Sequence, residues 1–188
     1  MMGEQKIGLL TNGVRFGSDR EDNDFYATDP VAVEKLLEVE KFTNNILEPC
    51  SGLNHIVNVL RNKGYDVRST DIIDRGCQDE IRDIFEYEKV GRDIITNPPY
   101  KDCLKYVEKM YDMLEEGHKM ALLLKLTFLE GQSRKKFFEE HPFSRLWVHS
   151  KRISCMINGR EDKKNGCVAY GWYIWEKDYK GESIVKWL

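Results

Sequence analysis

The sequence predicts a three-layer α/β domain with a mostly parallel sheet and an antiparallel strand towards its C-terminal end. Short apolar runs alternate with segments whose apolar residues recur at helical spacing. Polar residues follow several of these apolar runs, and the last two runs have no helical segment between them. A chain of 188 residues with 41% apolar and 32% charged content is long enough for one domain with a sizeable core.

The first part of the chain alternates helices and strands after a polar start. Residues 1–24 are rich in Gly, Asn and Asp, which predicts a flexible arm before a single domain over residues 25–188. The elements predicted next are a helix over 28–42, a strand over 44–48, a helix over 52–64 and a strand over 65–71. The first helix begins near Pro30, and its apolar residues Val31, Val33, Leu36, Leu37 and Val39 predict a short amphipathic helix.

The second part of the chain continues the alternation and then changes. Its predicted elements are a strand ending at Asn97, a helix over 103–117, a strand over 118–126, a helix around 131–141, and strands over 144–150 and 167–176. Because no convincing helix separates the last two strands, we expect them to form an antiparallel pair near an edge of the sheet.

The cysteines and the apolar runs predict the cellular setting. The five cysteines show no paired motif and no metal-ligand spacing with the four histidines, so we expect reduced thiols, no metal and a cytoplasmic location. The first residues do not resemble a signal peptide, and no stretch approaches the roughly 18 apolar residues of a membrane span. We therefore expect no membrane partner.

Charge is distributed unevenly along the chain. The net charge is −3, but residues 131–164 hold nine Lys and Arg against four acids, which makes that segment +5. This segment is either an ordinary solvated surface or a surface for phosphates. The candidate phosphate contacts lie in or beside its loop 150–166 and are Lys151, Arg152, Arg160, Lys163 and Lys164.

Polar residues after the first two strands indicate a nucleotide-like cofactor. Ligands of such sheets collect beyond the carboxyl ends of the strands, at the point where the strand order reverses. Glu48 ends the first strand, Gly52 lets a backbone approach a ligand closely, and Asp71 ends the second strand, where an acid can hold ribose hydroxyls. Individually, Gly52 also fits a structural turn and Asp71 a helix cap, whereas together they favour an adenosine-type cofactor.

The sequence Asn-Pro-Pro-Tyr at positions 97–100 indicates the chemistry. An amine conjugated to a heteroaromatic ring is a weak nucleophile because its lone pair is delocalised. Two acceptors aimed at its N–H bonds, the Asn97 side-chain oxygen and the Pro98 carbonyl, favour a pyramidal nitrogen and expose that lone pair. Pro98 and Pro99 stiffen the turn, and Tyr100 offers a flat face for stacking, worth about 1–3 kcal/mol per base.

With this motif the sequence resembles the S-adenosylmethionine-dependent amino-methyltransferases, especially the adenine-N6 DNA methyltransferases and their small phage and prophage relatives. The resemblance rests on "FYATDP" (25–30), "ILEPCSG" (46–52), "RDIF" (82–85), "NPPY" (97–100) and softer matches in "LLLKLTFLEGQSRKKFF" and "GWYIWE". It implies a Rossmann-like fold and S-adenosylmethionine as cofactor. The cofactor contacts it implies are Thr28, Glu48, Pro49, Gly52, Asp71, Ile72, Asp83, Ile84 and Asn97, and the catalytic residues are Asn97, Pro98, Pro99 and Tyr100.

The chain departs from this family's pattern in two places. Asn54 stands where the cofactor loop usually has a second glycine, and we expect Asn to adopt the positive φ of that turn. The chain also leaves little room for a target-recognition region besides the loop 150–166. Extracting a base from a duplex costs a few kcal/mol, so we expect single-stranded nucleic acid or a recognition partner.

Two alternatives stay open. The same motif serves enzymes that methylate RNA bases or a glutamine amide in proteins, because each offers a planar conjugated NH2 group, although residues 25–30 favour DNA. The second alternative is a methyltransferase fold that binds nucleic acid or protein without catalysis, with Asn54 marking the decay of the cofactor loop. Retention of all four residues of the 97–100 motif argues against it.

Overall fold

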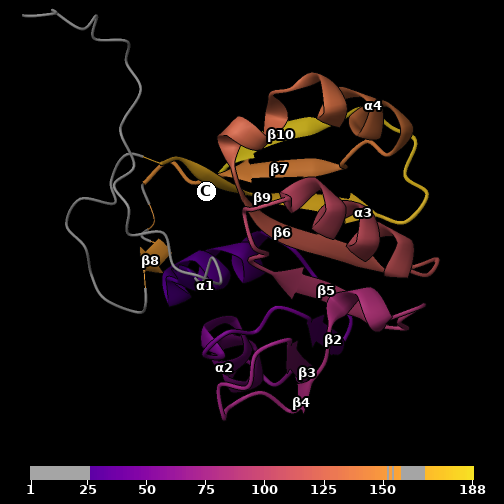
Figure 1. Cartoon of the computed structure of the whole chain (residues 1–188). Coiled ribbons are helices and arrows are strands. Elements are labelled where there is room, and N and C mark those ends of the chain that lie inside the picture. The colour runs from indigo at the N-terminus through magenta and orange to yellow at the C-terminus, as the bar shows by residue number, and fades with distance from the viewer. Residues whose placement is uncertain (1–25, 152, 154, 158–167) are drawn as a thin grey trace, which may run out of the picture.

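The computed structural model describes residues 26–151, 153, 155–157 and 168–188. Helices and strands alternate along most of this chain (Figure 1). In chain order the elements are β1 (Tyr26–Thr28), α1 (Pro30–Val39), β2 (Asn45–Glu48), α2 (His55–Asn62), β3 (Asp66–Asp71), β4 (Glu80–Ile81), η1 (Ile84–Glu86), β5 (Asp93–Thr96), α3 (Cys103–Met113), β6 (Lys119–Lys125), η2 (Leu126–Leu129), α4 (Gln132–Glu140), β7 (Arg145–Val148), β8 (Cys155–Ile157), β9 (Tyr170–Glu176) and β10 (Ile184–Trp187).

Eight strands form one mixed sheet in the order β10-β7-β9-β6-β5-β2-β3-β4. Strand β9 pairs antiparallel with both β6 and β7, whereas all other neighbours in this sheet are parallel. After the central strand β2, the chain adds β3 and then β4 on one side of β2. The next strand, β5, is added on the other side of β2. The strand order therefore reverses between β2 and β5, where ligands of open α/β sheets bind.

Two apolar layers bury the faces of the sheet. On one face α1 and α2 pack through residues such as Leu36 and Leu60, and on the other α3 and α4 pack through Met110 and Phe137. Figure 1 shows α1 and α2 on the lower side of the molecule and α3 and α4 in front of the upper strands. The strands at the centre of this three-layer arrangement are almost fully buried, as expected for parallel strands covered on both faces.

The structure confirms the predicted fold class, including the antiparallel pairing of the strands that became β7 and β9. The predicted first helix is present as α1, with Ala32, Val33 and Leu36 buried and the apolar Val31 and Val39 exposed. Four strands were not predicted. They are β4 and β10 in the main sheet, and β1 and β8, which form a two-stranded sheet of their own.

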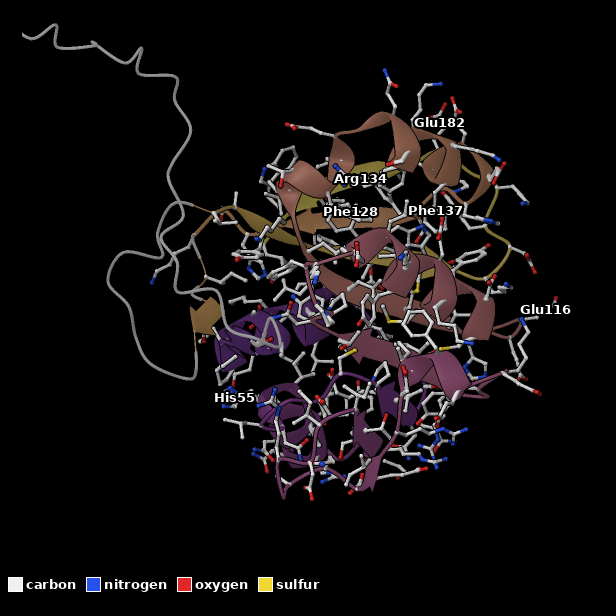
Figure 2. The ribbon with its side chains drawn as sticks, viewed as in Figure 1. His55, Glu116, Phe128, Arg134, Phe137 and Glu182 are labelled. Carbon is white, nitrogen blue, oxygen red and sulfur yellow. The ribbon has the colours of Figure 1, made fainter. Side chains whose placement is uncertain are left out.

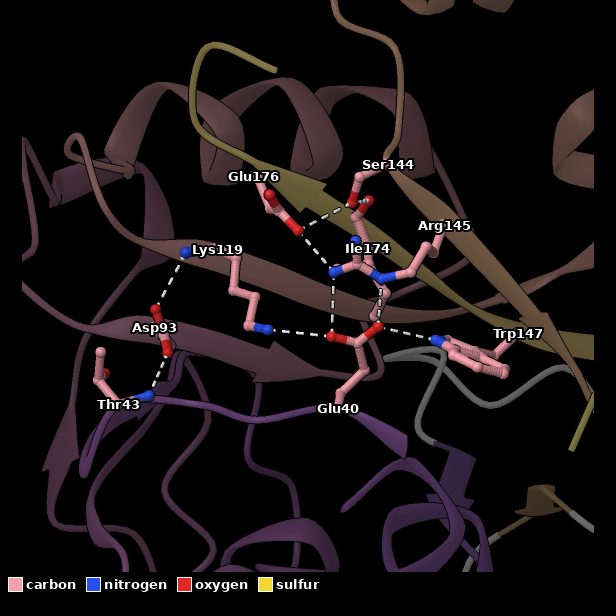
Figure 3. Close-up of polar contacts among 9 residues, drawn as sticks. All are labelled: Glu40, Thr43, Asp93, Lys119, Ser144, Arg145, Trp147, Ile174 and Glu176. Carbon is pink, nitrogen blue, oxygen red and sulfur yellow. Dashed lines mark hydrogen bonds and ion pairs between the residues drawn. The ribbon is translucent and has the colours of Figure 1, made fainter. Parts of the chain in front are cut away.

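A buried carboxylate ties α1 to the far half of the sheet. Glu40 directly follows α1, and its oxygens accept hydrogen bonds from Trp147 Nε1 (2.8 Å), Lys119 Nζ (3.0 Å) and the guanidinium of Arg145 (Figure 3). Burial alone would raise the pKa of Glu40, but hydrogen bonds from Arg145, Trp147 and Lys119 outweigh it and hold the pKa below its ordinary value. The network fixes the end of α1 against β6 and β7.

Several expectations fall outside this description. The predicted arm 1–24 and the positions Arg152, Arg160, Lys163 and Lys164 lie outside the described residues. Within the segment expected to be a basic loop, the structure places β8, which pairs antiparallel with β1. None of the helices in the described part of the chain is long and apolar enough to cross a membrane.

Candidate active site

The polar residues predicted to form a site lie at one edge of the sheet. Strands β2, β3 and β5 are parallel, so Glu48, Asp71 and the residue after Thr96 meet at their carboxyl ends. The ladder continues from Asp71 to Ile81 in β4, which brings Asp83 to the same edge. The carboxyl edge on both sides of the switch point therefore carries the candidate residues.

The loop between β2 and α2 has the backbone that its sequence predicted. Gly52 and Asn54 both adopt the left-handed conformation, with φ of 53° and 60°. Asn54 is buried, and its side-chain amide donates a hydrogen bond to the Cys77 carbonyl in the loop after β3. Asn54 thus takes the conformation that usually favours glycine, and its side chain ties this loop to the next one.

Asp71 joins the two loops from the end of β3. Its Oδ2 atom accepts a hydrogen bond of 2.8 Å from the Gly52 amide, and its Oδ1 atom accepts one of 2.9 Å from the Ile73 amide. Each oxygen keeps a second lone pair that can accept from a hydroxyl. The next side chain, Ile72, is 63% exposed and offers an apolar surface beside that carboxylate.

Glu48 is a carboxyl group buried from bulk solvent. It is 1% exposed, and its Oε1 atom accepts a hydrogen bond from the Thr96 hydroxyl at the end of β5. Burial raises the pKa of Glu48 well above its ordinary value, and the nearby Asp71 raises it further. Burial also raises the pKa of the Cys50 thiol, again helped by Glu48 and Asp71.

Buried polar atoms without partners concentrate in this loop. Glu48 Oε2, Ser51 Oγ, Asn54 Oδ1 and His55 Nδ1 are buried and make no hydrogen bond within the described structure. His55 begins α2 at the carboxyl edge, on the left of Figure 2, whereas Glu116 marks the opposite edge on the right. Burial lowers the pKa of His55, which favours a neutral ring. Native interiors rarely leave such atoms unpaired, so this cluster fits a polar ligand.

Asn97 is held from two sides. Its Nδ2 group donates to the Thr28 hydroxyl at 3.1 Å, and its Oδ1 atom accepts from the Tyr100 hydroxyl at 2.8 Å. Thr28 is buried at the end of β1, so the segment before α1 reaches across to the end of β5. These two contacts orient the amide.

The Tyr100 ring has two neighbours that the sequence did not single out. The Lys125 ammonium, from the last residue of β6, lies 4.4 Å from the ring centroid. The ring of Tyr170, which pairs with Lys125 in the sheet register, lies 5.9 Å from that of Tyr100. The sequence assigns neither residue a role, and the pairing of β6 with β9 brings them together beside Tyr100.

The remaining predicted positions are less closely linked to this cluster. Asp83 Oδ1 accepts from the Phe85 amide and caps η1, while Ile84 is buried in the core on the α3 face. Pro98 is buried and Pro99 half-buried. Lys151, three residues after β7, is exposed. Acceptance by the Pro98 carbonyl stays a prediction, as do all the expected cofactor contacts, which are Thr28, Glu48, Pro49, Gly52, Asp71, Ile72, Asp83, Ile84 and Asn97.

The comparisons with known proteins define the class of fold. No protein-family model matches the chain, and no curated protein matches its sequence. Solved structures do match it, and several are S-adenosylmethionine-dependent methyltransferases. With identities below 25%, the likeness establishes a shared fold: the chain has the Rossmann-like fold of the class I methyltransferases.

Three particular structures illustrate the likeness. A provisionally assigned class I methyltransferase from Listeria monocytogenes is 15% identical, with a TM-score of 0.56, over 89% of this chain and 67% of that one. The type IIG restriction endonuclease BpuSI is 9% identical, with a TM-score of 0.58, over 86% of this chain. A provisionally assigned RNA methyltransferase from Pyrococcus horikoshii is 13% identical, with a TM-score of 0.53, over 78% of this chain and 79% of that one. The match spans only 26% of BpuSI.

Proposed function

We propose that the chain is an S-adenosylmethionine-dependent N-methyltransferase that acts on a conjugated exocyclic amine, with adenine in DNA as the first candidate. The observation that carries this proposal is the position of Asn97. Its amide is held by Thr28 and Tyr100 at the end of β5, across the switch point from Glu48, which the Thr96 hydroxyl contacts.

The cofactor half of the site lies over β2 and β3. Asp71 offers lone pairs for ribose hydroxyls, Ile72 offers an apolar surface for a purine, and Gly52 leaves room for close backbone approach. The unpaired atoms of Glu48, Ser51, Asn54 and His55 supply further polar contacts, which is the reason we assign the cofactor here. S-adenosylmethionine, when bound, supplies an electrophilic methyl group.

The acceptor half lies over β5. Asn97 Oδ1 accepts one N–H of the amine and the Pro98 carbonyl accepts the other, which directs the nitrogen lone pair outwards. With S-adenosylmethionine held by Glu48, Gly52 and Asp71, the nitrogen would take its methyl group as the methyl–sulfur bond breaks, and water would accept the amine proton that is released. Tyr100 stacks on the ring that carries the amine, so that positioning supplies most of the catalysis.

The choice of adenine in DNA rests on the resemblance of residues 25–30 and 97–100 to the adenine-N6 enzymes. RNA is the second candidate acceptor, because adenine carries the same amine there and one structural neighbour bears the name of an RNA methyltransferase. A protein glutamine remains an acceptor that the same chemistry permits. A fold that binds without catalysis would need neither Asn97 nor its two bracing contacts.

Calorimetry with S-adenosylmethionine tests the cofactor assignment. We expect binding by the native chain and at least tenfold weaker binding by Asp71→Ala, whereas Asp66→Ala, an exposed acid at the other end of β3, serves as the matched control. Absence of binding at millimolar cofactor would refute the enzymatic proposal.

Transfer of a labelled methyl group then identifies the acceptor. Single-stranded DNA, duplex DNA, RNA and bulk protein are compared, and we expect single-stranded DNA to be labelled most. Asn97→Ala should abolish transfer and leave cofactor affinity nearly unchanged. Full activity in that variant would refute the role assigned to Asn97.

A further inference from the structure

The carboxyl edge of the sheet is divided by charge. On the cofactor side β3 and β4 end in, or are followed by, the carboxylates Asp71 and Asp83, while β2 ends in the buried carboxyl group of Glu48. On the other side the parallel strands β5, β6 and β7 end in, or are followed by, Lys101, Lys125 and Lys151. Both halves meet at Asn97.

The three lysines lie along the same edge. In the order β5-β6-β9-β7 they span three strand intervals, which is about 14 Å at roughly 4.8 Å per interval. Lys101 and Lys151 are exposed and Lys125 is half-buried.

Lys125 links the row to the acceptor site. Its ammonium lies over the Tyr100 ring at 4.4 Å, and the Tyr100 hydroxyl reaches Asn97. A ligand that stacks on Tyr100 therefore has a cation beside it, with a further lysine on either side along the edge. A glutamine amide in a protein carries no phosphates for these lysines to bind. A nucleotide within a strand, in contrast, has a phosphate on each side of its base.

We propose that Lys101, Lys125 and Lys151 form a phosphate-binding row that guides a single strand of nucleic acid across β5, β6 and β7, with Lys125 also bracing Tyr100. This inference rests on the proposed function, since it assigns the polymer that brings the amine to Asn97. The contacts are to phosphates and carry no sequence preference.

Binding of oligothymidylate tests the row separately from catalysis, because thymine has no exocyclic amine to be methylated. Affinity is measured by fluorescence anisotropy over a range of salt concentrations. Each phosphate contact on a single strand contributes a slope of about 0.7 in log affinity against log salt. We expect Lys101→Gln, Lys125→Gln and Lys151→Gln each to lower the slope by about this amount, and the triple variant by about 2.

Lys63→Gln and Lys180→Gln are matched controls, because both lysines are exposed and lie in connections at the opposite edge of the sheet. The phosphate-binding role of the three lysines would be refuted by an unchanged salt slope in the triple variant, or by an equal loss of slope in the control variants. Equally tight binding of a glutamate-rich peptide would assign the surface to an acidic protein instead and also overturn the proposal.

The outcomes separate the row from the catalytic proposal. If the native chain fails to bind S-adenosylmethionine and the slopes still fall as expected, the methyltransferase proposal fails and the row stands. If methyl transfer is observed while the slopes do not change, the row fails and the catalytic proposal stands. Unlike Lys125→Gln, Lys125→Arg should keep the native salt slope and affinity, because Arg retains the charge and stacks on aromatic rings. That result would support a cationic role for Lys125.

Discussion

The Tyr100 hydroxyl donates a hydrogen bond of 2.8 Å to the Oδ1 atom of Asn97, three residues earlier in the same turn. In the proposed mechanism Tyr100 would therefore orient the Asn97 oxygen as well as offer a stacking surface. Tyr100→Phe keeps the ring and removes this bond, whose net value is about 0.5–1.5 kcal/mol. We expect methyl transfer to slow about 3- to 10-fold with cofactor affinity unchanged, as measured by single-turnover labelling.

Tyr100→Ala serves as the comparison, because it removes the ring too. Its acceptor affinity should fall by a further factor that corresponds to about 1–3 kcal/mol of stacking. If Tyr100→Phe and Tyr100→Ala behave alike, the ring contributes nothing and the stacking role is wrong.

Thr28 accepts the other hydrogen bond of the Asn97 amide, across 69 residues of sequence. Thr28→Val preserves the shape and leaves the Nδ2 donor without its acceptor, a loss of about 1–3 kcal/mol. We expect methyl transfer to slow by roughly tenfold. Thr28→Ser should retain most of the rate because the hydroxyl remains, and a Val variant as active as the native chain would show that Asn97 needs no such support.

The buried carboxyl of Glu48 predicts a dependence of stability on pH. Its pKa is raised above the ordinary 4.5, so above pH 4.5 the folded state binds more protons than the unfolded state and stability falls as pH rises. Glu48→Gln removes this titration. We expect the variant to match the native chain near pH 4 and to have the higher melting temperature at pH 8.

The Glu48→Gln comparison requires only melting curves at several pH values in the absence of cofactor. Glu34→Gln, at an exposed site on α1, is the matched control and should show no such divergence. A variant that is less stable than the native chain at pH 8 would mean that Glu48 is ionised in the fold.

Glu40 predicts the opposite behaviour. Its pKa is held below the ordinary value, so its contribution to stability is present above pH 4.5 and is lost as pH falls. Glu40→Gln removes the buried carboxylate that pairs with Lys119 and Arg145, although Arg145 keeps its ion pair with Glu176, and we expect the free energy of unfolding to fall by about 3–5 kcal/mol.

Urea denaturation at pH 7 measures the Glu40→Gln effect, and Glu38→Gln provides the contrast. Glu38 pairs with Lys35 on the exposed surface of α1, so its loss should cost less than about 1 kcal/mol. Equal effects of the two substitutions would show that the buried network contributes no more than a surface pair.

The sequence predicts the cofactor-side geometry because parallel strands carry their end residues to a common edge. Glu48, Asp71 and Asn97 each follow an apolar run, and the structure brings all three to the switch point. The positive φ expected at Asn54 is likewise confirmed, since this property depends on one residue and its turn.

Other features depend on pairings between distant segments and cannot be predicted from local sequence patterns. Strand β10 consists of four exposed residues without alternation, and only its ladder with β7 makes it a strand. Lys125 and Tyr170 become neighbours of Tyr100 through the pairing of β6 with β9. The contact between Thr28 and Asn97 joins segments that no periodicity connects.

The anchoring of α1 has a consequence for the order in which the chain can fold during synthesis. The Ala32 carbonyl accepts a hydrogen bond of 2.9 Å from Trp172 Nε1, a residue 140 positions later. At 5–20 residues per second, α1 emerges about 7–28 s before this partner is made. During that interval the apolar side of α1 lacks β9, and for most of it Glu40 lacks Arg145 and Trp147, because these residues lie 105 and 107 positions after Glu40. Helix α1 therefore completes its native contacts only after β9 has been synthesised.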